Sequence, residues 1–128
     1  MGPETHWCVG WGMIAAGFAV GALIGLGFHR EEFLGGYDSF RRRLVRLGHI
    51  AMIALGMFNI LFSLTVPQVA YQNGDLATIA SHCWLAGGIA MPSVCFLTAW
   101  RPAFKQAFAA PVCLLIAAAV LTAMEGVP

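Results

Sequence analysis

The chain has 128 residues, of which 59% are hydrophobic and only 10% are charged, and its mean hydropathy is +0.77. A soluble globule of this size needs more polar side chains to cover its surface, so the composition excludes an ordinary water-soluble domain. The formal net charge of only +1 argues against a basic face for nucleic acid. We therefore expect an integral membrane protein.

Four apolar runs lie between short charged stretches, and each has about 20 residues, the length an α-helix needs to cross the hydrocarbon of a bilayer. We predict membrane-spanning helices over residues 7–28, 44–66, 76–100 and 104–124. The runs are rich in Ala, Leu, Gly and Met and lack the alternation of barrel strands, which indicates an all-α fold class. Residues 1–128 are expected to form a single four-helix transmembrane bundle.

The first run has an alternative interpretation as a cleaved signal peptide. The segment before it carries Glu4 but no Lys or Arg, and no small-residue cleavage site follows it. We therefore expect the run to remain as the first spanning helix.

The cations indicate the orientation of the chain. All seven lie around the first and third connections: Arg30, Arg41, Arg42, Arg43, Arg46, Arg101 and Lys105. Positive residues in short loops stay on the cytoplasmic side, so we predict an N-out/C-out topology, in a membrane such as the bacterial inner (cytoplasmic) membrane.

Two local signals mark helix starts. Asp38 or Ser39 is predicted to be the N-cap of the second helix, which places the arginines 41–43 in its first exposed turn. Such a cluster binds anionic lipid headgroups in some proteins, but we favour the simpler role of a topology anchor. The residues Asn73, Gly74 and Asp75 predict a turn before the third helix.

A glycine repeat indicates how the first helix packs. Gly17, Gly21 and Gly25 recur every four residues and give one smooth face, as in a glycine zipper, on which a neighbouring backbone can settle. The neighbour is either another helix of this chain or a different subunit.

Polar residues form a stripe on the second predicted helix. Its members recur at intervals of three or four residues: His49, Met52, Gly56, Asn59 and Ser63. An amide in a bilayer needs a hydrogen-bond partner, so this stripe should face protein or a cofactor. A weaker stripe on the third helix has the members His82, Ala86, Ile89 and Ser93. Pro92 and Pro111 predict kinks in the last two helices.

The four histidines fall into two pairs by predicted depth. His6 and His82 belong near the outer interface, and His29 and His49 belong near the inner one. Two histidines at one depth can hold a haem b axially. For His6 and His29 we favour an anchoring role at the interface, because they lie so close to helix ends.

His49 and His82 are deeper and are the stronger ligand candidates. They begin antiparallel helices, so they should lie in opposite leaflets and should not share one haem. The second ligand is then expected from a methionine such as Met52 or from a partner subunit.

Cys8 and Cys83 should also approach the outer surface. There they could form a disulfide or, together with His6 and His82, a copper or zinc site with nitrogen and sulfur ligands. We favour neither, because a cysteine in an apolar helix most often packs as a small hydrophobic side chain.

The combined signals favour a small subunit of a multi-subunit electron-transfer or respiratory complex, with haem b as the candidate cofactor. The short loops, the glycine repeat and the histidines in both leaflets motivate this interpretation. One alternative is a transporter or channel for small solutes that associates with itself, although no Asp, Glu, Lys or Arg lies in the apolar core of any span.

The other alternative is a membrane enzyme or an assembly factor for a cofactor-bearing complex. No base and nucleophile are adjacent in the sequence beyond lone histidines and scattered serines. A non-catalytic or electron-transfer subunit is therefore favoured over a stand-alone enzyme, with other membrane subunits or a second copy as its partner.

Overall fold

The computed structural model describes residues 2–27, 29–66 and 74–125, and all the regular structure in these ranges is helical. The long helices are α1 (Pro3–Leu26), α2 (Phe40–Thr65), α3 (Gly74–Trp100) and α4 (Ala109–Glu125), with two short 3-10 helices, η1 (Phe33–Gly35) and η2 (Pro102–Phe108). The predicted all-α class is confirmed. Four helical segments are long and apolar enough to cross a membrane, the last being η2 and α4 together.

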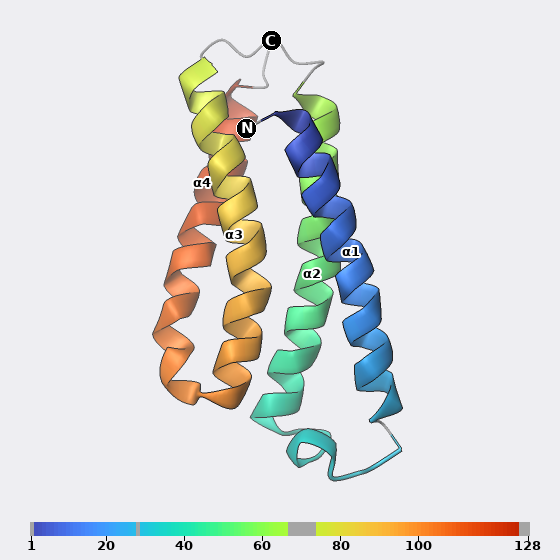
Figure 1. Ribbon diagram of the computed structural model, residues 1–128. Helices are drawn as coiled ribbons and strands as arrows, with labels where there is room; N and C mark the ends of the chain where they lie inside the picture. The colour runs from blue at the N-terminus through green and yellow to red at the C-terminus, as the bar shows by residue number, and fades with distance from the viewer. Residues whose placement is uncertain (1, 28, 67–73, 126–128) are drawn as a thin grey trace.

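Consecutive helices run antiparallel and pack side by side, α1 on α2, α2 on α3 and α3 on α4 (Figure 1). The start of α1 and the end of α4 lie at the same end of the bundle, which we call the terminal end (Figure 1). The opposite end holds η1, η2 and the cations that flank them, and we call it the basic end.

Local sequence signals explain where the helices begin. Helix α1 starts before its predicted boundary because Pro3 occupies the first helical position, where the missing N–H is not needed. Helix α2 begins at Phe40 because the Ser39 hydroxyl accepts the N–H of Arg42 at 3.1 Å. The predicted cap at Ser39 is thus confirmed. Of the predicted turn before α3, Gly74 and Asp75 open the helix, and Asn73 lies outside the described residues.

One prediction for the first turn of α2 is wrong: Arg42 is buried rather than exposed. Its guanidinium lies over the ring of Tyr37 at 5.2 Å, and that of Arg46 lies over the same ring at 4.8 Å. Two cations on one aromatic ring attach the first connection to α2.

The prolines of α3 and α4 occupy different positions. Pro92 lies inside α3. Pro111 is in the first turn of α4, where a helix has no backbone hydrogen bond to lose, so it does not demand the predicted kink.

The closest approach between two backbones joins α1 and α2. A Cβ atom on Gly56 would lie 2.7 Å from the carbonyl oxygen of Gly10, and a Cβ on Gly10 would lie 2.7 Å from the oxygen of Gly56. No side chain fits at either position unless the helices separate. These two glycines therefore set the distance between α1 and α2.

Only the first two glycines of the predicted repeat, Gly17 and Gly21, pack against α2. A Cβ on Gly17 would meet Ile53, and one on Gly21 would lie 2.7 Å from the imidazole Nε2 of His49. A Cβ on Gly25 would meet nothing within 4 Å. The glycines of α1 that pack against α2 are thus Gly10, Gly17 and Gly21, which lie nearer the terminal end than the predicted repeat. Gly10 is seven residues before Gly17, so it falls outside the four-residue spacing.

At the basic end, α1, α2 and α3 share an apolar core of Ile24, Leu44, Val45 and Ala99. Helix α4 packs on α3, where the indole N–H of Trp84 donates to the hydroxyl of Thr122 at 3.0 Å and Gly87 makes room for Leu115. Much of α4 is exposed.

The Gly10–Gly56 contact makes a testable prediction about stability. In Gly56→Ala the new methyl group meets a backbone oxygen that cannot rotate away, so we expect a loss of about 1–3 kcal/mol and a lower melting temperature in detergent. Gly25→Ala is the matched control, and it should melt at the wild-type temperature or slightly above it. Equal melting of both variants and the wild type would contradict the described packing of α1 on α2.

Candidate functional site

Three polar side chains from three helices meet at the terminal end: His6 of α1, Asn59 of α2 and Ser81 of α3. His6 and Asn59 are fully buried and Ser81 is 4% exposed. The imidazole Nδ1 lies 2.8 Å from Asn59 Oδ1, and Nε2 lies 2.8 Å from Ser81 Oγ. One side chain therefore links three helices, and we call this cluster the His6 network.

The bonding pattern of Asn59 determines the direction of the hydrogen bonds. Its amide nitrogen donates to the carbonyl oxygen of Leu55 at 2.9 Å, so the amide oxygen faces His6 and must accept. His6 Nδ1 is then the donor. In the neutral imidazole Nε2 accepts from the Ser81 hydroxyl, and every polar atom of the cluster is satisfied.

The surroundings of the His6 network are apolar and small. The ring of Phe62 lies 4.7 Å from the imidazole, centroid to centroid. Gly88 of α3 makes room for Asn59, because a Cβ there would lie 2.9 Å from the amide nitrogen. Hydrogen bonds in such a low-dielectric environment are strong, and leaving one partner unpaired is correspondingly costly.

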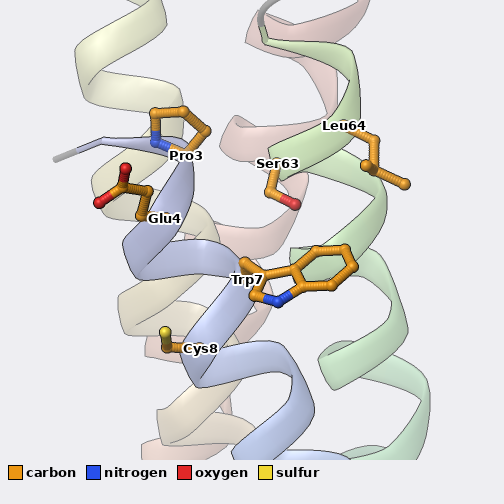
Figure 2. Close-up of a pocket in the computed structure, with 6 residues that line it drawn as sticks. All are labelled: Pro3, Glu4, Trp7, Cys8, Ser63 and Leu64. Atoms are coloured by element: carbon orange, nitrogen blue, oxygen red, sulfur yellow. The ribbon is translucent and has the colours of Figure 1, made fainter.

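A cavity of about 110 Å³ adjoins the network, lined by His6, Ser81 and Thr78 together with Pro3, Phe62, Val66 and Ala77. This volume holds several water molecules. A larger open groove of about 420 Å³ lies between α1 and α2, with Trp7 reaching toward α2 (Figure 2). Its lining is mostly apolar, and the Ser63 hydroxyl there donates to the carbonyl of Ile60 in its own helix.

The order hydroxyl, imidazole, amide is the one used by hydrolases that activate a nucleophile with a histidine base. Such chemistry also needs free donors for the developing oxyanion. Ser81 lies within α3, where backbone N–H groups bond along the helix. The Thr78 hydroxyl donates to Gly74, and the Asn59 amide nitrogen already donates to Leu55. The arrangement therefore fits a link between helices better than a hydrolytic centre.

The burial of His6 corrects the sequence analysis, in which an interfacial anchoring role was favoured. Its position near the start of α1 was misleading, because the neighbouring helices extend past it. Ser81 was not identified as a site residue. A signal was present, since Ser81 lies seven residues before Gly88 and thus shares its face of α3.

The other residues of the predicted metal site do not join the His6 network. His82 is exposed, and its Nδ1 lies 2.7 Å from the carbonyl oxygen of Thr78 in the preceding turn. Cys8 is exposed, Cys83 is half-buried and both are free thiols. Within the described ranges, no three His, Cys, Asp or Glu side chains lie close enough to hold a metal ion.

The residues predicted near the inner interface lie toward the basic end. His29 is exposed beyond the end of α1. His49 is half-buried against Gly21, with Met52 in the next turn of α2. Among the described residues, no hydrogen-bond partner of the His49 imidazole is found. Of the remaining stripe, Gly56, Asn59 and Ser63 are all buried.

The weaker stripe on α3 is not covered by the other helices of this chain. Its members His82, Ala86, Ile89 and Ser93 are all exposed. The Ser93 hydroxyl donates to the carbonyl of Ile89. Part of the stripe borders a mid-helix groove of about 190 Å³ whose other walls include Met13 and Met52.

Comparisons of the chain with protein-family models, curated protein sequences and solved structures gave no match. The clues to function are therefore the features of the chain itself. These are the buried His6 network, the outward-facing stripe of α3, the half-buried His49 and the concentration of cations at one end.

The His6 network makes a prediction about helix assembly. His6→Ala leaves Asn59 Oδ1 and the Ser81 hydroxyl without their partner, so we expect a loss of about 1–3 kcal/mol in thermal unfolding in detergent. His82→Ala is the matched control and should change stability little, because that side chain is exposed and bonds only within its own helix. A His6→Ala variant as stable as His82→Ala would show that the network does not hold the helices.

Proposed function

We propose that this chain is an integral membrane protein that spans the bilayer four times, with the terminal end outside and the basic end in the cytoplasm. Four long apolar helices support the proposal. Large apolar side chains are exposed on all four, for example Phe18, Ile50, Ile89 and Ile116. In water these surfaces would be a liability, whereas lipid solvates them. The cations at one end support the orientation.

The orientation can be tested by labelling. In a variant whose four native cysteines are replaced, Glu4→Cys should react with a membrane-impermeant maleimide on intact cells. Glu31→Cys should react only after lysis, because it lies in the first connection at the basic end. Both native residues are exposed, so access differs only by side of the membrane. Labelling of both positions on intact cells would refute the topology.

Within the membrane, we propose that the chain acts as a subunit of a larger assembly of the electron-transfer type. The observation that carries this proposal is a half-buried imidazole that the described residues leave without a hydrogen-bond partner. The His49 imidazole has no hydrogen-bond partner among the described residues, and the His82 side of α3 faces outward. Ionisable side chains in apolar spans are costly unless protein or a cofactor covers them.

Haem b is the cofactor that we propose, with His49 as its ligand. The His49 Nε2 lies against Gly21 of α1, so ligation requires the imidazole to turn toward the partner. His6 has both ring nitrogens engaged by Asn59 and Ser81 and is not available to a metal. The second axial ligand would come from a partner subunit or a second copy, because His82 begins an antiparallel helix at the other end. Met52 lies one turn from His49 on the same helix. The two side chains would approach an iron from the same side, so they do not suit its two axial positions.

A solute path along the polar stripe of α2 is less well supported. Asn59 is bonded to His6, and Gly56 packs directly on Gly10 of α1. These contacts fill the space that a path between α1 and α2 would need. A transport function would require another route through the assembly.

Purification in mild detergent tests the electron-transfer proposal. We expect co-purifying membrane subunits and a reduced-minus-oxidised spectrum with a haem b α-band and Soret band, both lost in His49→Ala. His29→Ala is the control and should keep the spectrum, since His29 is exposed beyond α1. A colourless preparation would refute the haem part, and a chain that purifies alone as a monomer would refute the subunit role.

A further inference from the structure

Two cations at the basic end are held against aromatic rings that face outward. Arg41 donates its Nε–H to the carbonyl oxygen of Ala99 at 3.1 Å, and its guanidinium lies over the ring of Trp100 at 5.8 Å. The Lys105 ammonium lies over the ring of Phe40 at 5.1 Å. Phe40 and Arg41 are consecutive residues at the start of α2, so both cation–ring contacts lie at the first turn of that helix. We call Phe40, Arg41, Trp100 and Lys105 the cationic shelf.

The cationic shelf is open to its surroundings. Arg41 and Lys105 are exposed, Trp100 is 58% exposed and Phe40 is 41% exposed. Within the described ranges, neither cation forms an ion pair. The Nε–H of Arg41 is committed to the backbone, and its terminal N–H groups remain as donors for a ligand.

Three other cations of this end are arranged differently. Arg42 and Arg46 lie on the ring of Tyr37 and attach the first connection to α2. Arg30 lines a separate open groove together with Glu31 and Glu32, so its charge lies beside two carboxylates. The shelf therefore combines two exposed cations, neither of which is paired with a carboxylate among the described residues, and it is a place where an anion is favoured.

We propose that the cationic shelf binds the phosphate of an anionic phospholipid, an inference that rests on the proposed membrane location. The shelf lies where α2 begins and α3 ends, which is the depth of the headgroups if the apolar helices span the bilayer. Trp and other aromatic rings favour this depth, and clustered Lys and Arg attract anionic lipids on the cytoplasmic side.

The geometry of the shelf favours specific binding over a diffuse attraction. A guanidinium and an ammonium together suit phosphate oxygens, the first as a planar donor and the second as a point charge. The backbone bond of Arg41 and the rings beneath both cations restrict their motion before the lipid arrives, which lowers the entropic cost of binding. The exposed ring faces also offer apolar surface to the glycerol and upper acyl chains.

The test measures lipid retention by native mass spectrometry of the detergent-purified full chain, with phosphatidylglycerol and phosphatidylcholine of the same acyl chains as probes. We expect preferential retention of phosphatidylglycerol. Lys105→Gln should weaken that preference about fivefold, and the double variant Arg41→Gln, Lys105→Gln about 30-fold. Lys105→Gln removes no hydrogen bond that the structure records, so the fold should persist. Lys105→Arg should retain the preference.

Arg30→Gln is the matched control, because it removes one positive charge from the same end but outside the shelf. It should leave the preference for phosphatidylglycerol unchanged. An equal loss in Arg30→Gln and Lys105→Gln would overturn the proposal in favour of a diffuse surface charge. Equal retention of the two lipids by the wild type would also overturn it, as would complete displacement of phosphatidylglycerol by millimolar inorganic phosphate.

The membrane proposal fails by a different observation. If the chain were recovered from cells in soluble form without detergent, the proposed membrane location and the shelf's lipid ligand would both be refuted. If instead the chain needs detergent and retains the two lipids equally, only the lipid site is refuted. The two failures are therefore distinguishable in the same preparation.

Discussion

The buried imidazole of His6 is the constraint on which the arrangement of the first three helices depends. It needs a partner on each ring nitrogen, and the partners come from α2 and α3. A shift of α1 by one residue rotates the imidazole by about 100° and breaks both hydrogen bonds. The network therefore fixes the register of α1, which the apolar contacts between helices define much less sharply.

Glycines make this arrangement possible. Gly10 and Gly56 let the backbones of α1 and α2 touch, which brings His6 within reach of Asn59. Gly88 then leaves space for the Asn59 amide on the side of α3. Close approach and polar bonding thus support one another. On the proposed membrane location such contacts matter more, because burial of apolar surface gives helices little advantage in an apolar solvent.

The two ends of the bundle use different interactions. The terminal end is held by neutral hydrogen bonds in a closed, apolar environment. The basic end is held by cations on aromatic rings and by the core around Leu44 and Val45. On the proposed membrane location, the first arrangement avoids charge within the hydrocarbon, whereas the second places charge among the headgroups. Helix α4 contributes to neither and packs mainly on α3.

The histidines show how much the tertiary structure adds to a functional argument. By residue type all four were candidate ligands, and their positions in the sequence favoured His49 and His82. The fold satisfies His6 completely, bonds one nitrogen of His82 within its own helix and leaves His49 half-buried without a partner in the described residues. The proposal of a partner subunit and a cofactor rests on this difference, because a polar group left open in an apolar region requires something else to cover it.

The sequence by itself determined the helical class, the four apolar segments, the cap at Ser39 and the gathering of the cations at one end, because these depend on local composition and spacing. It also placed Asn59 on a face that must meet protein or a cofactor, since an amide cannot be left unpaired in an apolar environment. Only the tertiary structure decided that the partner is His6, that Ser81 completes the network and that Arg42 is buried. Those outcomes depend on which faces of distant helices meet, and a helix surface alone does not specify its neighbour.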